Sequence, residues 1–321
     1  MSDGMQQLLG EILADADDDR PRLVLADMLS ERSDPRGEFI ALQCRVAARP
    51  LSSEAPAWTA RADALLAANM AEAVPARRWF AREATRVVFR RGFPDEVWGR
   101  QEAYLDAEPV PGLKLLHLGN CQDARTTRMA ASPILRHVQR LELHTAVSTD
   151  PLANRGLAAL ASVPFRMREL HVRSRTGPKG FVAFAENPTL AALDALELNT
   201  VSPGPAAAGL RALFARLPNL RRLQVRASGV SDAAAAALED LPPHVTHLDL
   251  GWNRHLGRGA LHLGSPALQE VSLSGTAVDD GVVRQLLERL AGLRVLTLRS
   301  TSVREVAHPR VAAGEVTLVT G

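Results

Sequence analysis

Three histidines and one glutamate occupy matching places in a repeated pattern and could act as metal ligands or as an acid–base pair. His117, Glu142, His144 and His171 each lie within or beside a doublet of leucine or valine residues. Zinc accepts imidazole and carboxylate ligands, and a His/Glu pair can transfer protons. No compact ligand-spacing motif accompanies them. We therefore interpret them as a solvated polar face and predict no metal, no cofactor and no catalytic residue.

Three aspartates near the start of the chain mimic the first half of a calcium loop. Asp15, Asp17 and Asp19 have the required alternation. The loop also needs a glycine at its sixth position and a carboxylate at its twelfth, where this chain has Arg20 and Ala26. We interpret the aspartates as the end of one helix and the cap of the next.

Two further patterns are assigned structural roles. The segment 177–180, of sequence GPKG, is rich in glycine but lacks the spacing of a phosphate-binding loop. It predicts a turn inside a polar loop excursion over 173–180. Cys44 and Cys121 are too far apart in the chain to suggest a disulfide framework or a zinc motif, and we expect both to be buried thiols.

These residues must be positioned by a repeated element. Doublets of the form L-x-L recur through the chain, and their first members are 23 to 29 residues apart. A period of this length indicates a solenoid of stacked units, here about eight, each with one strand and one helix. The doublets begin at Leu116, Leu141, Leu170, Leu196, Leu223, Leu248, Val271 and Leu296.

Side chains that flank each doublet point away from the core, because direction alternates along a strand. On neighbouring strands, about 4.8 Å apart, they form rows on a concave face. We predict that this face binds a protein partner, with Trp252, Arg226 and Arg299 as the centre of contact because tryptophan and arginine are favoured anchors. The alternative for Trp252 is packing into its own loop. The predicted contact residues are His117, Glu142, His144, His171, Arg173, Glu197, Arg222, Arg226, Asp249, Trp252 and Arg299.

Composition argues against other partners. The 38 basic and 36 acidic residues give a net charge of +2, which makes no electrostatic case for nucleic acid or membrane binding. Aromatic residues, which would stack on bases, make up 4% of the chain. No stretch approaches the ~20 apolar residues of a membrane span, and no signal peptide precedes the first helix. We expect a cytoplasmic monomer.

The pattern divides the chain into three regions. Residues 1–49 read as short helices, and 50–112 as a linker helix followed by strands that cap the solenoid. Residues 113–321 carry the repeats and end in a closing strand over Glu315–Val319.

The repeats resemble the leucine-rich repeat family, in its ribonuclease-inhibitor-like form with a helix in each unit. The motif L-x-x-L-x-L-x-x-N/C stands here from Leu113 to Cys121, and with valine first from Val245 to Asn253. Its ninth position needs a small polar side chain to satisfy backbone groups where the chain leaves the strand. Ala146, Arg175 and Val201 depart from this, so we expect units two to four to be less regular.

The first 45 residues have a resemblance of their own. The segment Pro21–Leu29 and the block Asp34–Ile40, of sequence DPRGEFI, look like a small bacterial repeat-companion domain whose function is not established. That family typically has tryptophan where this chain has Met28, and glycine where it has Ser33.

The sequence thus predicts an α/β leucine-rich-repeat solenoid preceded by a small all-α domain. Such a solenoid presents a surface, and we expect a non-catalytic protein-binding scaffold. Two alternatives remain open. One is regulation of an enzyme by direct binding, by analogy with ribonuclease inhibitor or the Ran GTPase-activating protein. The other is a metal-dependent enzyme built on the His/Glu cluster.

Overall fold

The computed structural model describes residues 3–70, 84–145, 150–200 and 206–320. Its eleven strands follow one another in sequence order in one sheet. The chain divides into two compact units, each described separately below. The first comprises Met1–Gly119 and Ala131–Gln139, and the second comprises Asn120–Ala130 and Arg140–Gly321.

The first unit begins with helices. They are α1 (Asp3–Ala14), α2 (Arg20–Ser30), α3 (Pro35–Ala48) and α4 (Ala55–Leu65), followed by one π-helical turn, η1 (Leu66–Met70). Two apolar clusters hold them together. Ile12, Leu29 and Ile40 belong to the first, and Phe39 and Leu65 belong to the second. The predicted linker helix is thus present as α4, while residues 71–83 lie outside the described part of the chain.

The DPRGEFI block is a helix start. The proline and glycine within residues 34–37 predict a turn, and this prediction is wrong. The Asp34 carboxylate accepts a hydrogen bond from the Arg36 backbone N–H at 3.0 Å, and α3 begins at Pro35. A Cβ on Gly37 would lie 2.5 Å from the carbonyl oxygen of Ala26, which means that α2 and α3 approach too closely for a side chain. Ser33, just before the cap, has a φ of +55°, a backbone conformation that favours the glycine typical of the companion domain.

The N-terminal aspartates tie elements of this unit together. Asp19 stands at the N-cap of α2, as predicted, but its side chain makes no capping hydrogen bond. Its carboxylate instead lies 3.4 Å from Nε of Arg91. Asp17 pairs with Arg91 and with Lys114. These carboxylates are therefore engaged by cations of the protein itself.

A β-hairpin completes the first unit. Strands β1 (Ala84–Arg90) and β2 (Phe93–Arg100) are antiparallel, and β2 pairs in parallel with β3 (Leu115–Cys121). The unit also contains two short 3-10 helices, η2 (Gln101–Tyr104) and η3 (Pro133–Arg136). Strands are thus present after the helix α4, in the order predicted for residues 50–112.

The second unit is a stack of parallel strands. They are β4 (Arg140–Thr145), β5 (Glu169–Ser174), β6 (Ala195–Thr200), β7 (Arg222–Val225), β8 (His247–Asp249), β9 (Glu270–Ser272), β10 (Val295–Thr297) and β11 (Thr317–Val319). Each doublet residue of β4–β10 is at most 2% exposed. The register between strands never shifts, so the predicted solenoid and its closing strand are confirmed.

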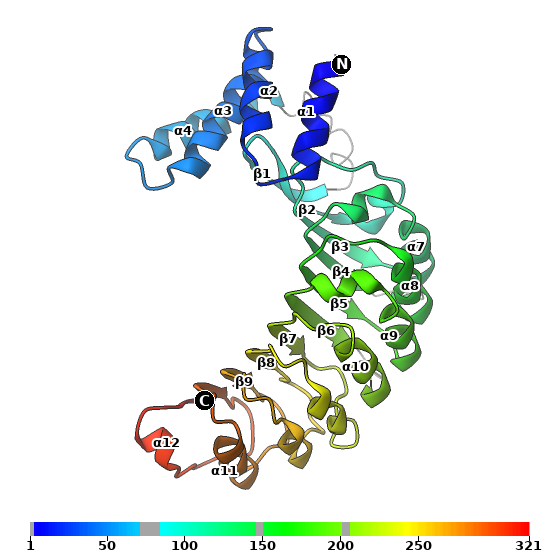
Figure 1. Cartoon of the computed structure of the whole chain (residues 1–321), viewed down its shortest axis with the longest axis vertical. Helices are drawn as coiled ribbons and strands as arrows, with labels where there is room; N and C mark the ends of the chain where they lie inside the picture. Colours follow the sequence, from blue (N-terminus) through cyan, green and yellow to red (C-terminus); the bar gives the residue numbers. More distant parts are fainter. Residues whose placement is uncertain (1–2, 71–83, 146–149, 201–205, 321) are drawn as a thin grey trace. The chain divides into compact units, whose positions relative to one another are not determined.

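In the second unit, helical segments cover one side of the sheet, the side toward which the buried doublet residues point (Figure 1). They are α7 (Asp123–Met129), α8 (Asn154–Ala159), η4 (Leu160–Ser162), α9 (Pro178–Phe184), η5 (Pro188–Ala192), α10 (Ala206–Phe214), η6 (Ala235–Asp240), η7 (Arg258–His262), α11 (Asp280–Arg289) and α12 (Pro309–Ala312). The expectation of an α-helix in every unit is wrong, since η6 and η7 are 3-10 helices. The doublet spacing across η7 is the shortest, 23 residues, and a 3-10 helix advances further per residue.

Polar side chains satisfy the backbone where strands end. Asn253, 1% exposed, accepts hydrogen bonds from the N–H groups of Ser228 and Val230. Its amide nitrogen donates to the carbonyls of Val225 and Leu250. This is the role predicted for the ninth motif position. The departures at positions 146 and 201 lie outside the described residues.

The predicted loop excursion over 173–180 is wrong. Gly177 is the N-cap of α9 and Pro178 its first residue, a position that suits proline. The N–H groups of Gly177 and Gly180 donate to Oδ1 of Asn154 at 2.8 and 3.1 Å. The polar GPKG segment is therefore the first turn of a helix, anchored by an asparagine of the preceding unit.

Candidate partner-binding face

The rows predicted from the doublets exist as predicted. The middle row runs through Glu142, His171, Glu197, Gln224, Asp249, Ser272 and Thr297, each paired with the next. His144 pairs with Arg173 in the row on one side, and Arg222 pairs with His247 in the row on the other. The structure therefore places the candidate residues that lie within the strands of the second unit on one sheet face, while Arg226, Trp252 and Arg299 follow strands.

Ion pairs neutralise the β4–β7 part of this face. An Arg140 Nη2 to Glu142 Oε1 distance of 2.7 Å marks one pair, and Arg140 Nε lies 3.7 Å from Glu169. Arg222 reaches Glu169 at 2.8 Å, although Ala195 stands between them in the row. The short alanine leaves room for this contact. Arg140 and Glu169, absent from the predicted set, are therefore central to the network, and their place directly before a doublet was the available signal.

His171 lies between two carboxylates. Its Nδ1 is 3.3 Å from Glu197 and 3.8 Å from Glu142. Burial lowers the pKa of His171 below its ordinary value, and the two carboxylates oppose that shift. The imidazole is therefore neutral at physiological pH, and it contributes hydrogen-bonding capacity rather than charge to the face.

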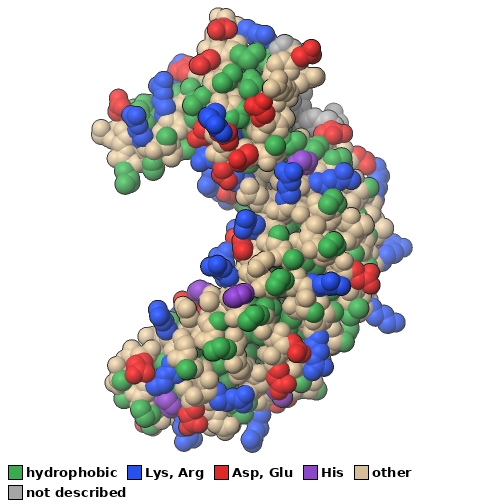
Figure 2. Space-filling model, in the orientation of Figure 1, with side chains coloured by type: hydrophobic (Ala, Val, Ile, Leu, Met, Phe, Trp, Pro, Cys, Tyr) green, Lys and Arg blue, Asp and Glu red, His purple; other side chains and the backbone are tan. Residues whose placement is uncertain are grey.

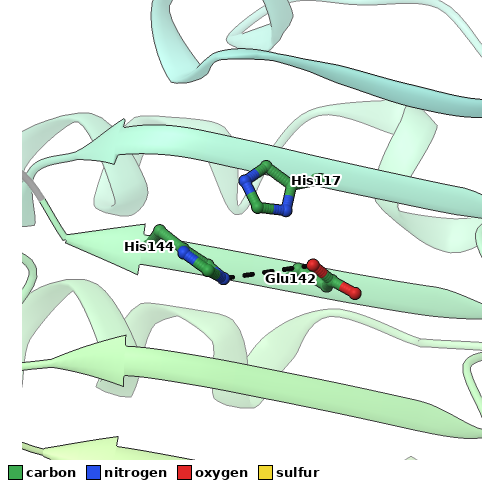
Figure 3. A group of neighbouring side chains, drawn as sticks. All are labelled: His117, Glu142 and His144. Atoms are coloured by element: carbon green, nitrogen blue, oxygen red, sulfur yellow. Dashed lines mark ion pairs between the residues drawn. The ribbon is translucent and has the colours of Figure 1, made fainter. Parts of the chain in front are cut away.

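The histidine–glutamate group offers possible metal ligands, drawn in Figure 3 as His117, Glu142 and His144. His117 belongs to the first unit, whereas Glu142 and His144 belong to the second. There, His144 Nε2 lies 4.0 Å from Glu142. The Glu142 carboxylate is already engaged by Arg140 at 2.7 Å, so a cation binding there would compete with an internal charge. In the second unit this group therefore forms part of a polar, ion-paired surface.

Trp252 follows β8 and is unusual in its backbone. Its φ is +64°, a conformation rare for a bulky residue. The indole lies against Gly275, since a Cβ there would be 2.7 Å from Cε3 of the ring. The indole therefore contacts the next unit. The side chain remains 44% exposed, so part of the indole faces solvent.

One arginine, Arg226, follows the neighbouring strand β7, and other arginines lie further along the sheet. Arg226 Nε lies 3.3 Å from Asp249 Oδ2, and the other oxygen of Asp249 accepts the Gly251 N–H at 2.8 Å. Arg173 and Arg299 are exposed, and within the described ranges neither has an ion pair. The guanidinium group of Arg226 is therefore held by an ion pair, whereas those of Arg173 and Arg299 are available to a partner.

Charges of both signs mix along the strand side of the second unit (Figure 2). No large field of one sign is present there, which agrees with the ion pairs above. Among the described residues, no helix is long and apolar enough to cross a lipid bilayer.

No family model matches this chain, and no curated protein does. Several solved structures are similar to part of it. An internalin (inlF) from Listeria monocytogenes shares 17% identity at a TM-score of 0.43, over 65% of this chain and 54% of its own, so this chain spans about half the length of that protein. A second, internalin C2 (inlC2), shares 15% identity at a TM-score of 0.43, over 72% and 81% of the two chains. The yeast Rad7–Elc1 complex shares 16% at a TM-score of 0.38, over 69% and 66%.

At such identities the fold assignment rests on the chain's own geometry. The unshifted parallel register, the buried doublets and the Asn253 turn define an α/β solenoid. Its strand, turn and helical segment repeat with the leucine-rich-repeat motif, and the protein has a solenoid fold of the leucine-rich-repeat type.

Proposed function

We propose that this protein is a non-catalytic scaffold whose exposed sheet face binds a protein partner, with Trp252 at the centre of contact. The observation that carries the proposal is the indole of Trp252, which follows β8 and stays 44% exposed. Among the described residues of the second unit, the large hydrophobic side chains that are exposed are Trp252 and Val182. Val182 lies in α9, on the helical side.

Packing within the protein explains why the buried half of the Trp252 side chain is stable despite its positive φ. A left-handed backbone costs a non-glycine residue roughly 1–2 kcal/mol. Covering about half of an indole recovers about 3 kcal/mol, from a side chain of roughly 250 Å² at about 25 cal/mol per Å². Burial against Gly275 therefore outweighs the strain. The 44% that stays exposed gains nothing from folding, and it becomes favourable only when a partner covers it.

The surroundings of Trp252 suit a binding surface. Gly251, Ser272 and Ser274 have small side chains or none, so a partner can approach the indole. Arg226 is held by Asp249, which reduces the entropy lost on binding. A rigid tryptophan with nearby arginines is the residue combination that dominates many protein interfaces.

The proposal is tested with the full chain as bait and a native lysate as prey. Trp252→Ala removes the indole, and Val182→Ala removes a comparably exposed apolar side chain from the helical side. A partner purified from this capture should bind Trp252→Ala at least about 30-fold more weakly, as for an interface hot spot, and Val182→Ala unchanged. Thermal melts check that both variants fold. A partner that binds both variants as tightly as the original chain would refute the proposed centre of contact.

A further inference from the structure

A second surface of this unit lies at the other ends of the strands. Trp252 follows β8, whereas a hollow of about 630 Å³ lies where β5 to β8 begin. It is lined by segments that directly precede four successive strands, with Arg168 before β5, Asp194 before β6, Arg221 before β7 and His244 three residues before β8. A hollow of this volume is as large as a typical small-molecule pocket, about 300–1,000 Å³, and can therefore hold a few side chains of a ligand.

Basic side chains dominate this hollow. Arg166, Arg168 and Arg221 line it together with His244, against the carboxylate of Asp194. Arg168 Nη1 lies 3.0 Å from Asp194 Oδ2, with 69% of the Arg168 side chain exposed. Arg221 is exposed, and it has no ion pair within the residues described. Arg168 is already paired with Asp194, so the positive charge that the described residues leave uncompensated in this hollow is that of Arg221, in a chain whose net charge is only +2.

The walls are fixed before any ligand arrives. Backbone N–H groups of Asp194 and Arg221 donate to the carbonyls of Arg168 and Asp194 at 2.8 and 2.9 Å. The Asn219 side chain donates to the carbonyl of Ala191 at 2.8 Å. Phe165, 5% exposed, supplies an apolar contribution to the lining. Rigid walls lose little freedom on binding.

We propose that this hollow, which we call the arginine groove, binds an extended acidic segment of a partner protein. Strands β5 and β7 are two steps apart in the sheet, about 10 Å at about 4.8 Å per step. A peptide in the extended polyproline II conformation rises about 3.1 Å per residue with three residues per turn. Carboxylates three residues apart therefore lie about 9 Å apart on one side of it and can reach Arg168 and Arg221. Nucleic acid fits less well, because single strands need exposed aromatic side chains to stack on, and Phe165 is buried.

The probe is a fluorescent octaglutamate peptide, with octaglutamine as its neutral counterpart, and anisotropy is measured on the full chain. Arg221→Glu should weaken octaglutamate binding at least about ten-fold, the effect of losing a charge-assisted contact. The matched control is Arg211→Glu. Arg211 lies on α10 and pairs with Asp240 at 2.9 Å, with 51% of its side chain exposed, and the change in net charge is identical. Its effect should stay under about two-fold, because exposed charges far from the groove are screened.

A second pair of variants acts in the opposite direction. Asp194→Asn removes the groove's carboxylate and should strengthen octaglutamate binding, whereas Asp240→Asn on the helical side should not. Equal weakening by Arg221→Glu and Arg211→Glu, equal binding of both peptides, or displacement by single-stranded DNA as effectively as by octaglutamate would each overturn the proposal. Trp252→Ala should leave peptide binding unchanged. The proposal for the arginine groove can therefore be refuted without affecting the proposal for Trp252, and the reverse also holds.

Discussion

Replacing Asn253 by alanine tests the physical basis of the repeat. The side chain makes four hydrogen bonds, to Ser228 N and Val230 N at 3.0 and 3.1 Å and to Val225 O and Leu250 O at 2.7 Å each. Alanine would leave four backbone groups without partners in a place where the side chain is 1% exposed. At about 1 kcal/mol net for each bond, we expect the free energy of unfolding to fall by about 4 kcal/mol.

The matched control is Asn199→Ala. Asn199 lies on the partly exposed sheet face, and its replacement should change the free energy of unfolding by no more than about 0.5 kcal/mol. Urea unfolding gives the global effect. Hydrogen exchange at the amides of Ser228 and Val230 gives the local one, which should accelerate by up to about a thousand-fold. A loss below about 1 kcal/mol with both amides still protected would show that Asn253 does not hold the turn.

Three further predictions concern single groups. Because the pKa of His171 is lower in the folded chain than in the unfolded one, the unfolded state binds more protons just below pH ~6.5, so stability should rise with pH through that window. His171→Gln should flatten the rise in urea midpoint between about pH 5 and 7.5, and an unchanged slope would contradict the assignment. Burial raises the pKa of the Cys44 thiol to about 12, so iodoacetamide at about pH 8 should modify Cys44 only after denaturation; rapid labelling of the native chain would show an accessible thiolate. Arg310 donates four hydrogen bonds to carbonyls from Leu287 to Leu293. Arg310→Ala should therefore lower the free energy of unfolding, measured by denaturation, by about 2–4 kcal/mol. Arg310→Lys should restore less than half of this loss, because its ammonium group cannot span the four carbonyls.

The sheet face could be predicted from sequence because two simple rules fix it. Alternation along a strand decides which side chains are buried, and a constant register decides which become neighbours. Glu197 follows His171 in the middle row for these reasons alone. The Asn253 turn was equally accessible, since a small polar residue ends the motif.

What escaped prediction depends on contacts between rows and on backbone angles. The Arg222–Glu169 pair requires knowing that Ala195 leaves the intervening position open. The contact of Trp252 with Gly275 follows from a positive φ that residue type argues against. The block at Asp34 contains proline and glycine, which favoured a turn, but the glycine is there because α2 passes within contact distance.

The helical side has a polar repeat that hydrophobic periodicity does not detect. Oδ1 of Asp232 accepts hydrogen bonds from the N–H groups of Gly257 and Gly259 at 2.7 and 2.8 Å, as Asn154 does for Gly180. A Cβ on Gly259 would lie 2.7 Å from Oδ1 of Asp232, so this close contact requires glycine. Successive units are thus hydrogen-bonded on both sides, through strands on one and through Asp or Asn side chains on the other. A sheet supported in this way can hold its exposed side chains in place before a partner binds, which lowers the entropy cost of recognition.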